Sequence, residues 1–126
     1  MASILLVDND MATAADIGDF LSEAGHEVHH AINGIAGLQV LIAHPISLII
    51  VARKALRMSS VDFLQSLRQY APYVETPVVM IGGTSGMEDV DASFGPSFSE
   101  EVFLATVSRL LRRSARPSRT YYAAAY

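Results

Sequence analysis

The 126 residues carry 51% hydrophobic side chains, a formal net charge of −4 and no cysteine. This composition is typical of one compact domain, and it excludes a disordered chain, a disulfide-framed domain and a thiolate metal site. The acidic balance, with a pI near 5.4, argues against a nucleic-acid binder. No apolar run approaches the roughly 20 residues that cross a bilayer, and the N-terminus lacks the pattern of a secretory signal, so we expect a cytoplasmic protein.

Strand and helix signals alternate along the whole chain. Short apolar runs predict the strands, and apolar residues at helical spacing between capping residues predict the helices. The predicted strands are residues 4–7, 27–31, 47–52 and 77–81, with a fifth after the connection 82–93. The predicted helices are 11–24 after Asp10, 34–44 after Asn33, 60–70, and a last one that ends at Arg113 and is capped by Ser97 or Ser99, where Ser97 and Glu100 fit a capping box.

The helical spacing also predicts which side of each helix is buried. These positions repeat every three or four residues, as one face of a helix requires. They are Ala14, Ile17, Phe20, Leu21 and Ala24; Ile35, Leu38, Leu41 and Ile42; Val61, Leu64 and Leu67; and Val102, Phe103, Thr106, Val107, Leu110 and Leu111.

The apolar run over residues 47–52 predicts a central strand of a parallel sheet, because it shows no alternation and so is covered on both faces. Alternating strands and helices imply right-handed crossovers and a three-layer α/β/α sandwich. The three most apolar strands should be central and the polar strand 27–31 an edge. Asp8-Asn9-Asp10, Ala52 and Gly82 would then converge where the central strands end, which is where such sheets place their chemistry.

Eight pieces of the sequence, in this order and spacing, carry a family resemblance. They are I-L-L-V-D-N-D, E-A-G-H-E-V, A-I-N-G-I-A-G-L, P-I-S-L-I-I-V-A, M-S-S-V-D-F-L-Q-S-L-R, T-P-V-V-M-I-G, G-P and S-E-E-V-F-L-A-T-V-S-R-L-L-R-R. Together they resemble the receiver domain of two-component response regulators over residues 3–113. The resemblance implies a flavodoxin-like (βα)5 fold with strand order 2-1-3-4-5. We therefore expect a receiver-like domain over residues 1–113 and a basic, aromatic tail over 114–126.

The family's functional positions fall mostly on residues that cannot perform the family's chemistry. Asp8 matches the first acidic position, Asn9 falls on the second, where the family usually has Asp, and Asp10 follows. The phosphoacceptor position is Ala52, and a methyl group cannot attack a phosphoryl donor.

The positions that sense the phosphoryl group are changed as well. Gly82 matches the Thr/Ser, Gly95 the Lys and Ala92 the aromatic switch residue, while Pro96 survives as a possible cis proline. The resemblance with these departures predicts a pseudo-receiver of bacterial signal transduction: not an enzyme, without cofactor or metal, regulating by binding protein partners independently of phosphorylation. A small-molecule- or metal-responsive sensor using the degenerate pocket is the alternative.

The connection 82–93 is about a helix shorter than in typical receivers, and it holds three glycines. We therefore predict that the fourth helix is shortened or lost. Two interpretations stay open: a short turn that covers the sheet, or a docking groove between the third and fifth helices. The first yields no partner surface, whereas the second makes Met87, Val90, Phe94 and Phe98 interface candidates, with self-association through the fourth/fifth-helix face possible.

Two further groups of residues have competing interpretations. Lys54 lies in a cationic run, 53–57, and could replace the missing metal as a charge lock on the carboxylates, or be one of several solvated cations. The tail carries Tyr121, Tyr122 and Tyr126, which suit an interface or packing back on the domain. The four histidines predict a polar strand edge rather than a metal site. We expect no membrane partner and no nucleic acid for this domain alone.

Overall fold

The computed structural model describes residues 2–82, 90–95 and 97–114. Its strands are β1 (Ser3–Val7), β2 (Glu27–Ala31), β3 (Leu48–Ala52), β4 (Val78–Ile81) and β5 (Ala92–Phe94). Its helices are α1 (Met11–Glu23), α2 (Gly34–Ala43), α3 (Ser60–Gln69) and α4 (Glu100–Ser114), with short 3-10 turns η1 (Arg53–Ala55) and η2 (Ala71–Tyr73). Within these ranges no helix has the length and hydropathy needed to span a membrane.

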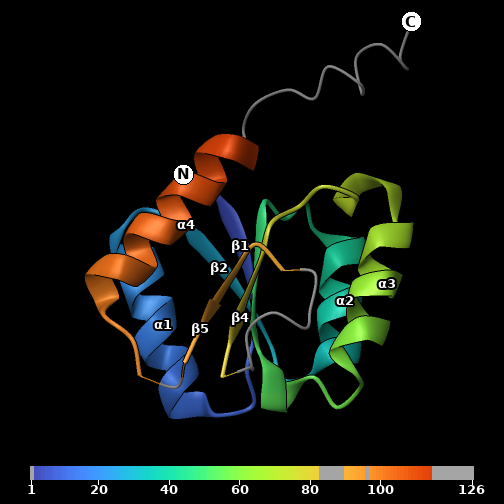
Figure 1. Cartoon of the computed structure of the whole chain (residues 1–126), viewed down its shortest axis with the longest axis horizontal. Helices are drawn as coiled ribbons and strands as arrows, with labels where there is room; N and C mark the ends of the chain where they lie inside the picture. Colours follow the sequence, from blue (N-terminus) through green and yellow to red (C-terminus); the bar gives the residue numbers. More distant parts are fainter. Residues whose placement is uncertain (1, 83–89, 96, 115–126) are drawn as a thin grey trace, which may run out of the picture.

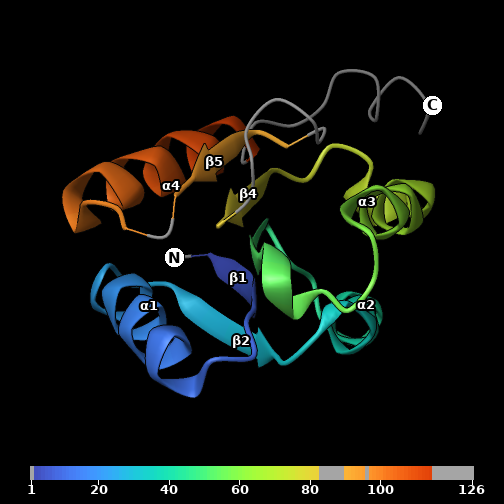
Figure 2. The same cartoon turned by 60° about the horizontal axis from the view of Figure 1, so that its bottom comes forward.

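The five strands form one parallel sheet in the order β2-β1-β3-β4-β5. Helices α1 and α4 cover one face and α2 and α3 the other (Figure 1). The turned view in Figure 2 shows the same three layers, with the sheet between the two helix pairs. The predicted sandwich and strand order are confirmed, including β3 at the centre with every residue buried and the polar strand β2 at an edge.

Two separate cores lie on the two faces of the sheet. The α1/α4 side packs Ile17, Leu21 and Phe103 against alternate residues of the strands. The α2/α3 side packs Phe63 and Leu67 against the other set. Because side chains of a strand alternate between faces, each apolar strand residue serves one core, which is why the central strands show no polar position.

Capping side chains fix where the helices begin. Asp10 accepts from the backbone N–H groups of Ala12 and Thr13, at 3.1 and 3.2 Å. Asn33 and Ser59 cap α2 and α3 in the same way.

The last helix, α4, is capped by Ser99, whose Oγ accepts from Val102 N–H at 3.4 Å. Ser99 was one of two predicted caps. The predicted box between Ser97 and Glu100 is wrong because Glu100 is the first residue of the helix, not its third.

The buried side of α2 differs from the prediction. Ile35 and Ile42, predicted to face inward, are 59% and 67% exposed, whereas Gly34 and Gly37 are buried with Leu41. A Cβ at Gly37 would lie 3.0 Å from Val7 Cγ2, so the helix rests on the sheet through its glycines. Apolar spacing alone predicted that the bulky residues face the sheet, but the close approach of the helix to the side chains of Val7 and Leu5 requires a glycine there.

Three other positions predicted to be buried are also exposed. Val61 and Val102 lie on the outer sides of α3 and α4, and Ala24 follows the last residue of α1. In α3 the buried aromatic ring is Phe63, one position from the predicted stripe. In α1 and α4 the buried stripe is narrower than predicted, and in α3 it includes Phe63 in place of Val61; the predicted helices themselves are unchanged.

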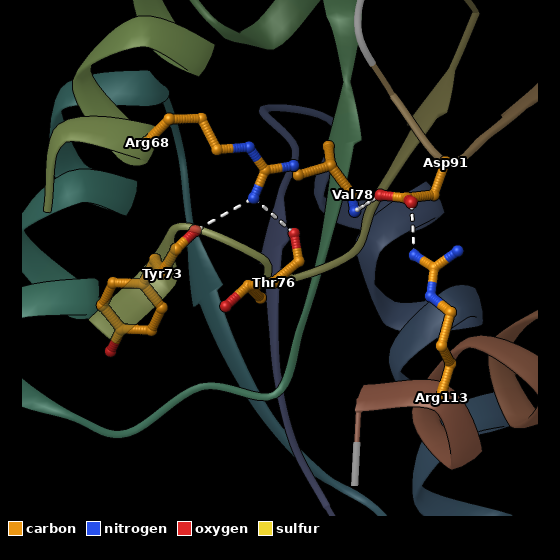
Figure 3. A network of polar contacts seen from close by, with 6 residues as sticks. All are labelled: Arg68, Tyr73, Thr76, Val78, Asp91 and Arg113. Atoms are coloured by element: carbon orange, nitrogen blue, oxygen red, sulfur yellow. Dashed lines mark hydrogen bonds and ion pairs between the residues drawn. The ribbon is translucent and has the colours of Figure 1, made fainter. Parts of the chain in front are cut away.

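Arg68 holds the turn that leads into β4. Its guanidinium Nη1 donates to the backbone carbonyl oxygens of Tyr73 and Thr76, at 2.9 and 2.6 Å (Figure 3). Carbonyls in an irregular turn have no ladder partner, and a charged donor satisfies them well. This contact fixes the start of β4 against the end of α3.

Asp91 ties the start of β5 to β4 and to α4. Its Oδ2 accepts from Val78 N–H at 2.9 Å, and its backbone N–H donates to the Val78 carbonyl at 2.9 Å. Its other oxygen pairs with the guanidinium of Arg113 near the end of α4 (Figure 3). The connection 82–91 is shorter than the dozen or more residues of a usual helical crossover. A shortened fourth helix is consistent with this, and residues 83–89 lie outside the described part.

Candidate functional site

The C-terminal ends of β1, β3 and β4 bring the predicted site residues to one edge of the sheet. The register pairs Val7 with Val51, and Ala52 with Ile81, so Asp8, Ala52 and Gly82 each stand at or just past the end of neighbouring strands. The predicted convergence of these three strand ends is therefore found in the structure. It follows from parallel pairing, since all strands end at the same side.

Asp8 is enclosed at this edge, with 1% of its surface exposed. Its Oδ1 accepts from Asp10 N–H at 2.9 Å, and its backbone N–H donates to the Ala31 carbonyl at 2.9 Å. Asn9, between the two acids, is exposed. The buried carboxylate is thus held by a hydrogen bond from the loop's own backbone, which fixes its orientation.

Asp10 faces the solvent and belongs to the helix rather than to Asp8. The backbone hydrogen bond from Thr13 is the largest influence on the pKa of its carboxyl and, with hydrogen bonds from the Thr13 side chain and Ala12, lowers it below the ordinary value of 3.8. Desolvation, the second-largest effect, opposes this lowering, and the charge of Lys54 adds a minor one. The carboxylate therefore serves the first turn of α1, where the helix dipole also favours a negative charge.

Lys54 lies in η1, directly after Ala52 and Arg53, and both cations are exposed. Across residues 2–82, 90–95 and 97–114, no ion pair joins Lys54 to either carboxylate, and its effect on Asp10 acts at longer range. The charge lock remains a prediction, with a weak electrostatic influence in its favour.

Ala52 closes β3 with 5% of its surface exposed, packed in the α2/α3 core. Its methyl group is therefore part of the hydrophobic interior beside Asp8. An aspartate at this position would place a carboxylate where the methyl group of Ala52 now packs against apolar side chains.

Gly82 has a left-handed backbone, with φ +79, and its N–H donates to the Phe94 carbonyl at 2.8 Å. Side chains branched at Cβ rarely adopt this conformation. The backbone conformation at this position, which the resemblance assigns to a Thr/Ser sensor, therefore favours glycine.

The remaining resemblance positions lie on and after β5. Ala92 is half-buried against the α1/α4 core. Gly95 is exposed, and a Cβ added there would meet no described atom within 4 Å. Pro96, the possible cis proline, lies outside the described residues.

The predicted interface residues separate into two groups. Phe94 and Phe98 are half-buried and form an aromatic cluster with Phe103, with ring centroids 5.1–5.6 Å apart. Val90 packs against the α2/α3 core. Met87, Tyr121, Tyr122 and Tyr126 lie outside the described residues. The described members thus contribute to the cores and expose only part of their surface.

Histidines border the site from the edge strand β2. His30 Nε2 lies 2.6 Å from the Asp8 carbonyl oxygen; since a carbonyl can only accept, this ring nitrogen carries the proton. His29 pairs with Glu27 at 2.7 Å and contacts the ring of His44. In the described ranges no group of three or more His, Asp or Glu could hold a metal ion. The sequence analysis missed the His30–Asp8 contact, which the pairing of β1 with β2 creates.

A second feature that sequence reasoning missed is an open hollow of about 370 Å³ between β2 and α2. It borders the end of β2, where His30 and Ala31 also contact the backbone of Asp8. Its lining is mostly apolar or small, and comprises His30, Ala31, Ile32, Ala36, Gln39, Val40, Ala43 and His44. The two glycines in the sequence of α2, Gly34 and Gly37, are the signal from which the exposure of its bulky residues could have been predicted.

Comparison with known proteins yields relatives of low sequence identity. No family model matches the chain. It is 27% identical over 128 residues to a transcriptional regulatory protein, the CpxR homolog of Haemophilus influenzae, covering 94% of this chain and 54% of that protein. It is also 27% identical over 124 residues to the DNA-binding dual master transcriptional regulator RpaA of Synechocystis, covering 92% and 52%. The chain spans about half the length of these curated relatives.

Solved structures share the architecture. The chemotaxis response regulator CheY4 of Vibrio cholerae superposes with a TM-score of 0.77 at 23% identity, covering 87% of this chain and 98% of that one. The signal receiver domain of a histidine kinase from Syntrophus aciditrophicus reaches 0.82 at 21% identity, covering 94% and 96%. The chain therefore has the flavodoxin-like fold of receiver domains.

Proposed function

We propose that this chain is a pseudo-receiver: a receiver-like module of bacterial signal transduction that regulates by binding protein partners and is not phosphorylated. The observation that carries the proposal is Ala52, a buried methyl group where the resemblance places the phosphoacceptor. Formation of an acyl phosphate needs a carboxylate nucleophile, and without one the reaction is absent rather than slow. The low-identity relatives named as regulators support the signalling role.

The neighbouring positions support the same proposal. A divalent cation normally neutralises phosphate oxygens in phosphoryl transfer. Here Asp10 is used as a helix cap, and Gly82 has a backbone that disfavours the hydroxyl-bearing Thr. The pocket has thus lost both the nucleophile and the groups that would read a phosphate, so a phosphorylation switch would have nothing to act through.

Incubation with acetyl phosphate and Mg²⁺, followed by intact-mass measurement, tests this function. We expect no phosphoryl adduct on the natural chain, while a phosphorylation-competent receiver in the same mixture gains one. The Ala52→Asp variant, run in parallel, shows whether the remaining pocket supports transfer once a carboxylate is present. An adduct on the natural chain would contradict the proposal.

A partner-binding role is tested by affinity purification with the full chain and with a chain ending at Ser114. We propose that the tail 114–126 follows a receiver-like domain of residues 1–113 and that its tyrosines contribute to a protein interface. Loss of a captured partner on truncation is the expected result. Equal capture by both chains would assign the interface to the folded domain instead.

The alternative, a sensor that binds a small molecule or metal in the degenerate pocket, is favoured by one observation. Asp8 keeps a buried carboxylate at the sheet edge where β4 leads into Gly82, and no described atom would meet a Cβ added at Gly82 within 4 Å. Thermal unfolding with Mg²⁺ or Mn²⁺, against NaCl of matched ionic strength, distinguishes the two. The pseudo-receiver should show no cation-specific stabilisation, whereas a sensor should show one that Asp8→Asn removes.

A further inference from the structure

Helix α2 has an unusual composition for a surface helix. Its ten residues, G-I-A-G-L-Q-V-L-I-A, contain no charge, and Gln39 is its one strongly polar side chain. A helix that is apolar on all sides is typical of a buried element. Only one side of α2 is buried: Gly37 lies against β1 and Gly34 against Leu56 and Met58, and Leu41 is buried on the same side.

The opposite side of α2 exposes its largest side chains. Ile35, Gln39 and Ile42 are spaced by four and three residues, which places them on one face of the helix. Both isoleucines are more than half exposed, as is Ile32 just before the helix. We call Ile35, Gln39 and Ile42 the α2 face. Burying this face would be favourable by roughly 25 cal/mol for each Å² of apolar surface removed from water.

A recess borders this projecting face. Gln39 belongs to both: it stands between the two isoleucines and it lines the hollow of about 370 Å³ between α2 and β2. The floor and walls of the hollow include the small side chains Ala36 and Ala43. One surface of the molecule therefore carries bulky apolar projections beside a recess lined by small and apolar side chains together with His30 and His44.

We propose that the α2 face pairs with the α2 face of a second copy of this chain about a two-fold axis. In such a pairing the same patch serves on both subunits, so it must be complementary to itself. An axis running parallel to α2 beside Gln39 makes the two α2 helices parallel and sets the isoleucine side of one copy against the recess side of the other. Each copy's isoleucines then project toward the other copy's recess, as knobs enter holes in packed helices.

The chemistry of the face favours a second copy over a charged partner. A surface that recognises an acidic or basic partner carries the complementary charge, and α2 carries none. Two uncharged faces meet without repulsion, although the chain as a whole has a net charge of −4. Gln39, at the axis, can both donate and accept, so its carboxamide can bond to its own symmetry mate.

The size of the face sets the expected affinity. Ten residues of helix are only about 15 Å long, so the pairing falls in the class of small, weak interfaces. We therefore expect a reversible dimer that dissociates on dilution. This pairing does not depend on whether Ala52 precludes phosphorylation. It also uses a different surface from the fourth/fifth-helix face that the sequence predicts for self-association.

Sedimentation equilibrium on the full chain, at concentrations up to about 1 mM, tests the pairing. We expect a concentration-dependent dimer whose dissociation constant rises at least tenfold in the Ile35→Glu/Ile42→Glu double variant. Val102→Glu is the matched control, because Val102 is 56% exposed on a helix of the opposite layer. It should leave the dimer unchanged. Circular dichroism confirms that all variants are folded.

A cross-linking measurement adds a test of geometry. The natural chain has no cysteine, so a single introduced thiol reports one position. Under mild oxidation Gln39→Cys should form a covalent dimer, because this residue lies beside the axis, whereas Val102→Cys should not. A chain that stays monomeric throughout, or a dimer lost only in Val102→Glu, would overturn the proposal; the latter would assign self-association to α4.

Discussion

Helices α2 and α4 cover opposite faces of the same sheet, yet they present opposite kinds of surface to the solvent. Helix α4 begins with Glu100 and Glu101 and ends with Arg112 and Arg113, which also complement its dipole. Helix α2 is uncharged along its whole length and turns two isoleucines outward. The surface of α4 thus carries charges in its first and last turns, whereas the exposed side of α2 is uncharged and largely apolar.

The two helices are also positioned by different means. In α4 the bulky residues Phe103, Val107 and Leu110 are buried, as the apolar spacing predicts. In α2 Gly34 and Gly37 are buried together with Leu41, and Ile35 and Ile42 are exposed. An apolar residue at helical spacing is therefore evidence for a helix, but the residue that meets the sheet depends on how closely the helix packs on the side chains of the strands.

The largest expected loss of stability should be the same in both layers, because the layers differ in their exposed surfaces and not in their buried cores. Phe63 and Phe103 are each fully buried, one in each core. We expect Phe63→Ala and Phe103→Ala each to lower the free energy of unfolding by about 3–5 kcal/mol. Urea titration measures both. A much smaller loss at Phe63 would show that the α2/α3 core is loosely packed, and would break the comparison.

Substitution of two helical glycines should have effects of opposite sign. A Cβ at Gly34 would lie 2.9 Å from the Leu56 carbonyl oxygen and 2.8 Å from Met58 Sδ, whereas one at Gly18 in α1 meets nothing within 4 Å. Gly34→Ala should therefore cost about 1–3 kcal/mol through overpacking.

The matched variant Gly18→Ala should stabilise by about 0.5–1 kcal/mol, because alanine favours helix and loses less backbone entropy on folding. Thermal and urea unfolding of the two variants gives both signs. Stabilisation by Gly34→Ala would mean that α2 can move away from η1 and α3 without loss.

Sequence patterns predicted that β1, β3 and β4 are central and that β2 is an edge, because burial on two faces leaves a continuous apolar run and burial on one does not, whereas the full strand order followed from the family resemblance. The convergence of Asp8, Ala52 and Gly82 followed from parallel pairing alone. What the patterns could not predict depends on contacts between distant residues. The rotation of α2 depends on Gly37 meeting Val7, and the placement of His30 depends on its reach to Asp8.

The hydroxyl of Tyr73 should contribute an intermediate amount to the free energy of unfolding, because it bonds to the end of α2. Its buried hydroxyl donates to the carbonyl oxygens of Leu41 and His44, at 2.6 and 2.7 Å, where the helix ends and these carbonyls have no helical partner. Burial raises the pKa of Tyr73, so the proton is present at neutral pH. Tyr73→Phe should cost about 1–3 kcal/mol by leaving the carbonyls unsatisfied.

The comparison variant is Tyr70→Phe, whose ring stacks on Tyr73 from an exposed position. It keeps the stacking and should change the free energy of unfolding little. Equal losses in the two variants would show that ring packing, and not the bond to the end of α2, stabilises this corner.

The smallest effect distinguishes a charged cap from a neutral one. Asp10 caps α1 by accepting from two backbone N–H groups and Asn33 caps α2 by accepting from one, and hydrogen bonds from Thr13 and Ala12 lower the pKa of Asp10 below 3.8. A carboxyl whose folded-state pKa is lowered stabilises the fold fully above its unfolded value, and this contribution is lost as the pH falls through the folded value. Asp10→Ala should therefore cost most at neutral pH and progressively less below about pH 4. Asn33→Ala should cost about 1 kcal/mol at every pH, because an amide does not titrate in this range. Urea unfolding of both variants at pH 7 and pH 3 measures the difference, and a pH-independent cost at Asp10 would show that its charge contributes nothing to the cap.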